Sequence, residues 1–379
     1  SKELELRRDL RLAHAKLVAA KSSAPRDKKK KAFWSGTLKI ARIFEETHDV
    51  KTFRFVNPDG GPLPFEHAAG QYINLKLTID GKRVNRSYTI ASSPTRNAYC
   101  EISVKRAANG YGSKHLHDTW KEGQRVQVSA PAGKFFFAGH EADKIVLIAG
   151  GIGITPMMSV VRSLTDRGWA GQIYLVFSVR KKQDVVFAHE IMDLQERHAN
   201  LHVRITLTND PESEWTGARG QITKELLADF IPEFKHGPVM LCGPDPMMTA
   251  MRQLLVTLGI PDAEIHQEAF ISTPPVDMTA DLQEAEEALP EGVMPSLSFQ
   301  KSGINAEQPA ELSVLEVAEE AGVAIPFECR SGICGQCKTR LVSGKVRMEV
   351  QDALTQQDRA KGLILACQAR ATRDCVIDA

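Results

Sequence analysis

The sequence Cys329-Arg-Ser-Gly-Ile-Cys334-Gly-Gln-Cys337, followed after 29 further residues by Cys367, decides how the rest of the chain is interpreted. Its C-x4-C-x2-C…C spacing is typical of the four thiolate ligands of a [2Fe-2S] cluster. A zinc site more often shows two C-x2-C pairs. Disulfide bonds are more typical of small, cysteine-dense chains in oxidising compartments. We therefore expect these four cysteines to hold an iron–sulfur cluster, which carries one electron at a time.

Length and composition indicate a soluble globular protein of two to three domains, with 379 residues, 42% of them hydrophobic and 25% charged. Three further cysteines, Cys100, Cys242 and Cys375, are odd in number and show no pairing pattern. They favour a reducing, cytoplasmic location with no disulfide bonds. The long apolar run at residues 145–161 contains three glycines and a proline, so we expect no membrane helix. No signal peptide is visible. The chain begins with Ser rather than Met, which leaves open that it is part of a longer polypeptide.

The net charge of +1 hides two segments of opposite sign. Residues 1–34 hold 11 Lys/Arg against 4 Asp/Glu, and we interpret residues 1–32 as a basic helical arm. A solvated arm, a partner contact and a membrane-surface contact all remain open for it. Residues 271–294 hold six acidic residues and no basic one, and residues 273–294 are interpreted as an acidic linker. We expect no nucleic-acid partner and a monomer.

Three patterns divide the remaining chain. Residues 33–139 show six short strand patterns separated by turn residues, which favours an antiparallel β-barrel. Residues 140–272 alternate strand and helix, which predicts a doubly wound α/β domain with a parallel sheet. Residues 295–379 contain strand patterns, a helix opened by the capping box of Ser313 and Glu316, and the cysteine loop.

Two motifs in the α/β region suit a nucleotide. Gly150-Gly151-Ile-Gly153-Ile-Thr155-Pro156 lies where a buried strand turns into a helix, and such a turn brings backbone amides close to a pyrophosphate. A plain tight turn explains the glycines about equally well. Cys242-Gly243-Pro244 closes a later strand of the same sheet, at the edge where ligands collect. A buried cysteine followed by a turn is the structural alternative.

Two motifs in the barrel region suit a phosphorylated ring compound. In Arg86-Ser87-Tyr88-Thr89, the Arg could neutralise phosphate, the Tyr could stack on a ring and the Thr hydroxyl could bond a ring nitrogen. By itself the motif is more typical of an exposed strand. In Gly110-Tyr-Gly112-Ser113, a glycine-rich turn with Ser113 as the N-cap of a short helix is a second phosphate-binding candidate. A plain helix cap is equally consistent with it.

Together these motifs resemble those of the ferredoxin–NADP reductase superfamily, and within it the reductases that carry a C-terminal plant-type ferredoxin. The resemblance covers about residues 36–379. It implies a flavin-binding barrel, a doubly wound nucleotide domain and a C-terminal β-grasp ferredoxin domain. It also implies electron transfer from NAD(P)H through FAD and [2Fe-2S] to a terminal oxygenase, hydroxylase or similar partner. The reductase part of a self-sufficient fusion enzyme and a redox-sensing module remain the alternatives.

The resemblance also implies roles for individual residues. Thr89 stands where most relatives have Ser, and the hydroxyl is retained. Thr89, Cys242 and Glu268 are the residues expected nearest the hydride path. The expected cofactor-binding residues are Arg86, Ser87, Tyr88, Thr89, Gly110, Gly112, Ser113, Gly151, Gly153, Thr155, Pro156, Ser178, Arg180, Cys242, Gly243, Pro244 and Phe270. The expected metal ligands are Cys329, Cys334, Cys337 and Cys367. The acceptor is expected to dock near the exposed rim of this cysteine loop, around Arg330, Ser331 and Ile333.

Two cofactor choices remain. The sequence Ser92-Ser93-Pro94 resembles the FAD branch of these reductases, whereas the FMN branch has Asn-Asp before the proline, so we expect FAD. Arg180 could accept the 2′-phosphate of NADPH, with help from Lys181 and Lys182, whereas Asp184 could suit the unphosphorylated ribose of NADH. The balance slightly favours NADH.

Overall fold

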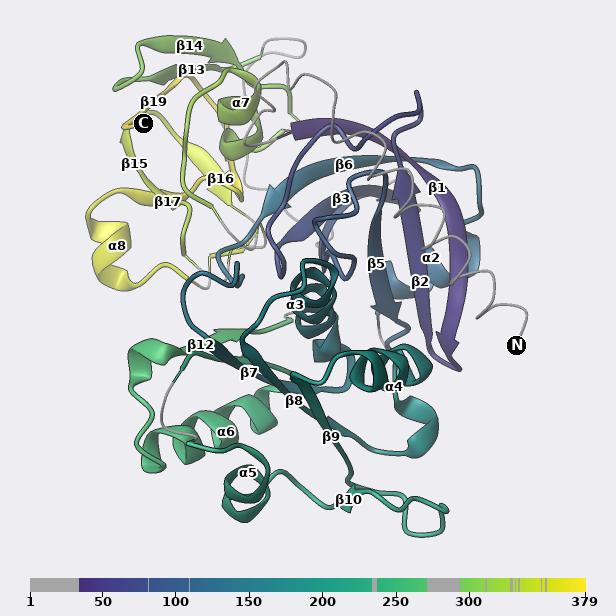
Figure 1. Cartoon of the computed structure of the whole chain (residues 1–379). Coiled ribbons are helices and arrows are strands. Elements are labelled where there is room, and N and C mark those ends of the chain that lie inside the picture. The colour runs from purple at the N-terminus through teal and green to yellow at the C-terminus, as the bar shows by residue number, and fades with distance from the viewer. Residues whose placement is uncertain are drawn as a thin grey trace.

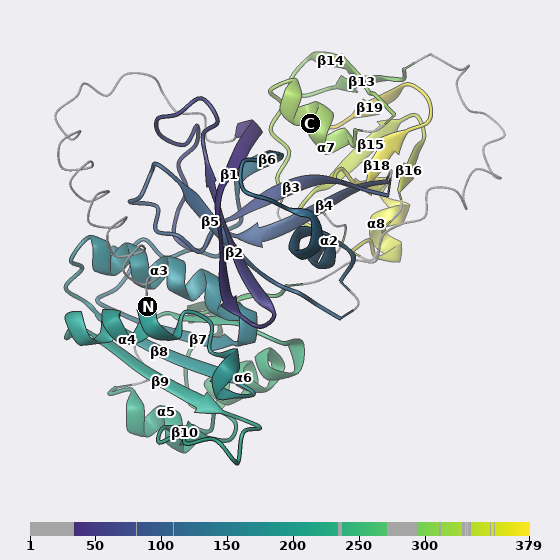
Figure 2. The same cartoon turned by 90° about the vertical axis from the view of Figure 1, so that its right-hand side faces the viewer.

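We describe the protein from a computed structural model. It describes residues 34–379, apart from residues 81, 109, 234–236, 271–293, 311, 328, 329, 331, 333, 334, 349 and 352. The basic arm and nearly all of the acidic linker therefore lie outside the described residues. Three units follow one another along the chain, each built on its own main sheet (Figure 1). We call them the barrel, the parallel-sheet unit and the C-terminal unit. Figure 2 shows the barrel strands lying between the other two units.

The barrel is a six-stranded antiparallel sheet in the order β4-β3-β6-β1-β2-β5. Its strands are β1 (Trp34–Thr47), β2 (Val50–Val56), β3 (Tyr72–Ile79), β4 (Lys82–Thr89), β5 (Cys100–Lys105) and β6 (Arg125–Ala132). Alternate apolar residues point inward, and Phe53, Phe55, Ile73 and Leu75 are fully buried in its core. All six strands expected from the sequence are present.

Two local features complete the barrel. The two-residue turn between β3 and β4 begins at Asp80, whose φ of 51° is the left-handed conformation that such hairpin turns require. Ile90, directly after β4, pairs with Ile102 of β5 and so joins the two edge strands of the sheet. Helix α2 (Tyr111–Thr119) follows β5. Ser113 lies inside its first turn and not at its N-cap, which is Gly110, so the predicted cap was wrong by three residues.

The parallel-sheet unit has six parallel strands in the order β10-β9-β8-β7-β11-β12. They are β7 (Lys144–Gly150), β8 (Gln172–Val179), β9 (Leu201–Leu207), β10 (Ala218–Arg219), β11 (Val239–Cys242) and β12 (Ile265–Glu268). The helices are α3 (Ile154–Asp166), α4 (Ala188–Arg197), α5 (Lys224–Phe230) and α6 (Asp245–Thr257), with short 3-10 turns η1 (Gly151–Gly153), η2 (Lys182–Asp184) and η3 (Asp262–Glu264). Helix α6 and the strands β10 and β12 were not predicted.

Buried residues divide these helices between the two faces of the sheet. Leu147 and Leu175 pack with α3 and α4 on one face, whereas Val146 and Val176 pack with α5 and α6 on the other. A sheet covered on both faces explains the continuous apolar strands that the sequence showed. The chain order reverses between β7 and β11, which creates the crevice where such sheets bind ligands.

The C-terminal unit is a five-stranded sheet in the order β14-β13-β19-β15-β17, with β13 and β19 parallel and the other pairs antiparallel. Its strands are β13 (Ser296–Phe299), β14 (Ile304–Glu307), β15 (Lys338–Ser343), β17 (Leu363–Leu365) and β19 (Cys375–Ile377), beside the pair β16 (Val346–Met348) and β18 (Ala369–Ala371). Its helices are α7 (Val314–Glu320) and α8 (Gln356–Ala360). Ser313 and Glu316 form the predicted capping box at the start of α7. The expected fold classes of all three units are confirmed.

Candidate functional site

Strand β4 presents the first group of expected cofactor-binding residues. Thr89, at its end, is 4% exposed, and its Oγ1 has no hydrogen-bond partner among the residues that the structure describes. A buried hydroxyl without a partner is costly. The Thr89 hydroxyl therefore fits a site where a bound group supplies a polar atom, such as a ring nitrogen, as its hydrogen-bond partner. Tyr88 packs against the barrel core, and burial raises the pKa of its phenol to about 12, so it stays neutral. This end of β4 therefore fits a flavin ring.

The structure brings Arg86 and the glycine-rich turn together, although they are far apart in the sequence. A Cβ added at Gly112 would lie 3.1 Å from Cγ of Arg86, so a side chain at this position would have to displace Arg86 by a few tenths of an ångström. Ser113 accepts a hydrogen bond from the Ala107 amide through its Oγ at 3.2 Å. A cation and a helix start that lie next to each other form a suitable site for a pyrophosphate.

The glycine turn of the parallel-sheet unit lies against the turn after β11. A Cβ added at Gly153 would lie 2.3 Å from the carbonyl oxygen of Cys242, and one at Gly150 would lie 2.8 Å from Cδ of Pro244. Gly151 has a φ of 52°, which a glycine adopts without strain. The two expected nucleotide motifs therefore form one backbone-lined surface at the carboxyl ends of β7 and β11.

The start of α3 extends this surface. Thr155 is buried and donates a hydrogen bond from Oγ1 to the Ile152 carbonyl at 3.1 Å. Pro156 lies in the first turn of the helix, where its missing N–H has no intrahelical partner to lose. Strand β5 of the barrel lies against the η1 turn. The barrel and the glycine turn are therefore neighbours, as transfer between two bound rings would require.

Further along the same edge lies an open pocket of about 530 Å³, lined by Lys181, Lys182, Gln183 and Asp210. Asp210 follows β9 and was not among the expected residues. Its position after a parallel strand was the signal that could have identified it. Its Oδ2 accepts a hydrogen bond from the Lys182 amide at 2.8 Å.

Three other residues of this edge were expected to contact the nucleotide. Ser178 pairs with Gly150 in the register of β7 and β8, next to the glycine turn. Arg180 is exposed beyond the end of β8. Asp184 accepts a hydrogen bond from the Lys181 amide at 3.1 Å and caps the η2 turn, so its carboxylate is engaged locally.

Cys242 and Glu268 lie side by side, because they pair in the register of β11 and β12. Burial raises the pKa of the Cys242 thiol well above its usual range, and the Glu268 carboxylate raises it further. The thiol is therefore a neutral, polarizable group at the edge where the nucleotide motifs meet. Phe270 follows β12 and is 43% exposed.

Two of the four expected metal ligands lie within the described residues. The sulfur atoms of Cys337 and Cys367 are 3.2 Å apart, and both residues are buried. This separation is too long for a disulfide bond of about 2.05 Å. It suits two thiolates on one metal ion, because metal–thiolate bonds are about 2.3 Å long. Cys329 and Cys334 lie outside the described residues, so the geometry of the full ligand set is not described.

The cysteine loop differs from the expectation in one respect. We expected Arg330 to lie on an exposed rim where an acceptor docks, but it is 8% exposed. Its guanidinium pairs with the Glu319 carboxylate of α7 and lies 4.1 Å from the centre of the Phe327 ring. Gln368, next to Cys367, donates a hydrogen bond to the Arg330 carbonyl at 3.0 Å. Arg330 therefore attaches the cysteine loop to its own unit. Ser331 and Ile333, the other residues expected on this rim, lie outside the described residues.

Three family profiles match the chain in the same order as the three units. The oxidoreductase FAD-binding domain matches residues 37–137, the oxidoreductase NAD-binding domain matches residues 147–253, and the 2Fe-2S iron–sulfur cluster binding domain matches residues 298–372.

Curated relatives are similar over most of the chain. The glycine betaine monooxygenase reductase subunit of Pseudomonas aeruginosa is 35% identical over 348 residues, which is 90% of this chain and 94% of that protein. The ferredoxin reductase component of 3-ketosteroid-9-alpha-monooxygenase from Mycobacterium tuberculosis is 34% identical over 347 residues, or 89% and 94%. Among solved structures, phthalate dioxygenase reductase aligns with a TM-score of 0.57 at 29% identity, covering 91% of this chain and 98% of that one.

The fold, the site and these similarities define a flavin-dependent reductase with its own iron–sulfur domain. The chain belongs to the ferredoxin–NADP reductase superfamily, in the branch that carries a C-terminal [2Fe-2S] domain. It is an NAD(P)H-dependent oxidoreductase that uses FAD and a [2Fe-2S] cluster for electron transfer. None of the helices within the described residues has the length and apolar character needed to span a membrane.

Proposed function

We propose that this chain is the reductase component of a terminal oxygenase, to which it delivers electrons taken from NADH. The observation that carries the proposal is its similarity, over about 90% of its length, to reductase subunits of monooxygenases. Bound FAD converts the two-electron chemistry of nicotinamide into one-electron steps, and the cluster carries single electrons. The chain supplies the sites that hold these groups near one another.

In this proposal each motif has a distinct task. Thr89 donates to or accepts from the flavin ring with its buried hydroxyl, while Arg86 and the turn at Gly112 hold the pyrophosphate of FAD. The surface formed by Gly153 and Cys242 receives the nicotinamide, and the neutral thiol adds no charge of its own to the hydride path. Glu268 borders the same path. The four cysteines of the C-terminal motif hold the cluster from which electrons leave.

The preference for NADH rests on the pocket beyond β8. A carboxylate such as Asp210 can accept hydrogen bonds from ribose hydroxyls and repels a 2′-phosphate. Lys181 and Lys182 line the same pocket and favour phosphate, so the comparison of NADH with NADPH as electron donors decides this part of the proposal.

We also propose a cytoplasmic monomer, since the cytoplasm maintains the reduced thiols that Cys100, Cys242 and Cys375 require. These three cysteines are buried and free. The basic arm is proposed to contact the partner or a membrane surface, and it lies outside the described residues.

A reconstitution experiment tests the exit through the cluster. The purified chain, NADH and a candidate oxygenase with its substrate are combined, and product is measured beside ferricyanide reduction. Cys337→Ser should abolish oxygenase turnover, because one cluster ligand is lost, but keep flavin-dependent ferricyanide reduction. A matched control is Cys375→Ser, which removes a thiol from the same unit outside the predicted ligand set. Oxygenase turnover that persists at full rate in Cys337→Ser would refute the proposed exit.

A further inference from the structure

Arg162 joins three elements at the boundary between the barrel and the parallel-sheet unit. It lies on α3, the helix that begins directly after the glycine turn, and its side chain is 3% exposed. Its Nη1 donates a hydrogen bond of 2.6 Å to the carbonyl of Ala91, two residues after Thr89. Its Nε and Nη2 donate to the two carboxylate oxygens of Glu190 on α4, at 3.1 and 2.7 Å. One guanidinium therefore connects α3, α4 and the segment that follows β4.

Residues 91 and 92, which follow β4, are hydrogen-bonded both to α3 and to β5. The Ser92 carbonyl accepts a hydrogen bond of 3.0 Å from Ser159 on α3. On the barrel side, Ser92 Oγ accepts one of 3.0 Å from the amide of Glu101 on β5. The Ala91 amide donates to the Glu101 carbonyl at 2.8 Å. Residues 91 and 92 therefore have no freedom to shift relative to α3 or β5 without breaking buried hydrogen bonds.

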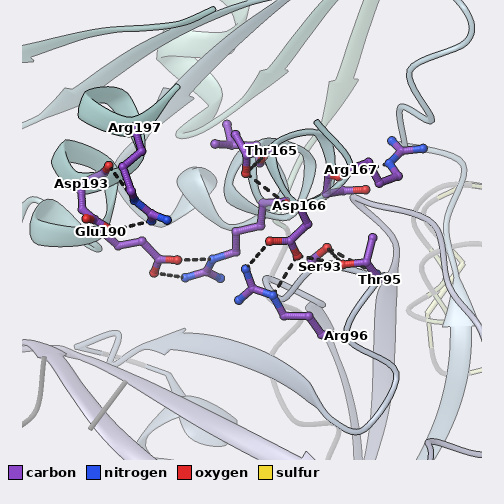
Figure 3. A network of polar contacts seen from close by, with 12 residues as sticks. Ser93, Thr95, Arg96, Thr165, Asp166, Arg167, Glu190, Asp193 and Arg197 are labelled. Atoms are coloured by element: carbon purple, nitrogen blue, oxygen red, sulfur yellow. Dashed lines mark hydrogen bonds and ion pairs between the residues drawn. The ribbon is translucent and has the colours of Figure 1, made fainter. Parts of the chain in front are cut away.

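A second ion pair fixes the other end of α3. Arg96 donates to both carboxylate oxygens of Asp166, at 2.8 and 2.7 Å, and Thr95 donates to Asp166 at 2.8 Å (Figure 3). Figure 3 shows Arg96, Thr95 and Asp166 clustered together, with Glu190 on the neighbouring helix. The helix is thus attached to the barrel at two points along its length.

Burying charges is an inefficient way to gain stability. Removing a guanidinium and a carboxylate from water costs several kcal/mol for each ion, and apolar residues of similar size often replace such pairs without loss. Glu190 is 7% exposed, and the guanidinium of Arg162 also lies 4.6 Å from the centre of the Phe187 ring. What the pair adds is a fixed orientation, because a planar guanidinium bonded to three acceptor oxygens, two of Glu190 and one of Ala91, holds them at fixed angles.

We propose that Arg162, held by Glu190, is a positioning residue that sets the distance between the nicotinamide and the flavin. Its bond to Ala91 fixes the strand that ends in Thr89 relative to the helix that begins at the glycine turn. Hydride transfer needs reacting atoms about 3–3.5 Å apart, and a misplacement of about 1 Å can lower the rate about 100-fold. This inference rests on the proposed flavin role of Thr89 and the proposed nucleotide role of Gly151 and Gly153.

The test distinguishes an effect on the positioning of the two rings from an effect on the stability of the protein. In Arg162→Met, the Glu190 carboxylate is left buried without its ion-pair partner, so the thermal midpoint should fall. In the double variant Arg162→Met/Glu190→Leu, both charges are gone and the midpoint should return towards wild type. The Ala91 carbonyl still lacks the hydrogen bond that Arg162 donated. The limiting rate of flavin reduction by NADH should therefore stay about 10- to 100-fold below wild type. The NADH concentration that gives half of that rate should not change, because the nucleotide surface is intact.

Two further measurements make the result independent of turnover. Amide hydrogen exchange should be faster in residues 89–93 and 150–156 of the double variant, although its thermal midpoint recovers. Arg162→Lys keeps the charge but not the planar donor group, and should slow flavin reduction in a well-folded protein. The matched control is Arg106→Met, which removes the partner of Asp118 in an exposed ion pair of 2.9 Å. It should change neither rate nor exchange.

A double variant with wild-type flavin reduction and wild-type amide exchange would overturn the positioning role. Normal reduction in Arg162→Lys together with normal exchange would do the same. Failure of the proposed function is recognised separately, because the wild-type protein would then not reduce its flavin with NADH or NADPH.

Discussion

The barrel meets its two neighbours through interfaces of different character. Towards the parallel-sheet unit it presents buried groups, among them Ala91 and Ser92, which bond to Arg162 and Ser159. Towards the C-terminal unit the described residues contribute the ion pair of Lys76 with Glu316, at 3.7 Å, and a 3.4 Å hydrogen bond from Lys134 to Gln336. The Lys76 side chain is 32% exposed and the Glu316 side chain 9%, whereas the Lys134 bond is exposed.

This difference matches the two kinds of transfer that the protein performs. A hydride moves only between atoms in near contact, so the units that hold the two rings need a fixed geometry. A cluster that receives electrons from the barrel and passes them to another protein must serve two neighbours. A weaker, partly hydrated contact permits that, because exposed ion pairs contribute only about 0–1 kcal/mol.

The largest expected effect comes from separating the C-terminal unit. A protease site placed within residues 273–293 should, after cleavage and removal of the C-terminal unit, leave a flavoprotein that still reduces ferricyanide with NADH. Reduction of cytochrome c should fall to the background of the assay, because the cluster is the exit for single electrons. The ratio of the two activities is the measurement. If cytochrome c reduction survives at full rate, electrons leave from the flavin directly. If ferricyanide reduction collapses while flavin stays bound, the C-terminal contact is not weak and the comparison fails.

A second prediction concerns the effect of low pH on the buried interface between the barrel and the parallel-sheet unit. Burial lowers the pKa of His67 to about 4, although the imidazole also hydrogen-bonds the Ser92 backbone. The unfolded chain binds the proton near pH 6.5, whereas the folded protein resists it until about pH 4. Stability should therefore fall as the pH is lowered through this window, by up to about 3 kcal/mol from this group alone.

The thermal midpoint of the transition that releases flavin, followed from pH 7.5 to pH 4.5, checks this prediction. His67→Gln should flatten the dependence, because glutamine does not titrate. His140→Gln, at an exposed position, should leave the dependence as it is in wild type. An equally steep acid loss in His67→Gln would show that other groups cause it.

The smallest effect is expected at the contact between Lys76 and Glu316. Lys76→Gln should slow electron transfer from flavin to cluster several-fold, and the salt sensitivity of that step should largely disappear. Glu316→Gln is the sharper variant, because glutamine can keep the capping box of α7 while the charge is lost. Stopped-flow absorbance of the flavin and of the cluster measures the step.

The control for this contact is Lys105→Gln, which breaks a 3.0 Å ion pair with Asp49 elsewhere on the barrel. Flavin reduction by NADH should be normal in all of these variants. Unchanged flavin-to-cluster transfer in both Lys76→Gln and Glu316→Gln would show that other groups orient the C-terminal unit.

The sequence predicted the fold well because the informative patterns are local. The alternation in β2, the glycine turn before α3 and the capping box at Ser313 each depend on a few adjacent residues. The motifs at Gly153 and Cys242 were also singled out as candidate binding residues, and their contact follows from the adjacent positions of β7 and β11 in the sheet. Asp210 was missed although it follows the strand pattern of β9, because the pocket that it lines also needs Lys181, Lys182 and Gln183 from the turn after β8.

The buried ion pairs of Arg162 and Arg330 could not be predicted from the sequence. Both residues resemble ordinary surface arginines when only their neighbours in the sequence are considered. Each is buried because a carboxylate from another segment, Glu190 or Glu319, reaches it in the folded chain. Such pairings depend on how helices pack, and one sequence contains no local signal for that.

The burial of Cys242 has a chemical consequence for the lifetime of the protein. Thiols are oxidised by peroxide through the thiolate form, first to sulfenic acid and then irreversibly to sulfinic and sulfonic acids. The raised pKa of Cys242 keeps this sulfur protonated, and it has no exposed surface. In the proposed function Cys242 lies beside the hydride path, and the protonation and burial of its sulfur atom should protect it from oxidation through many turnovers.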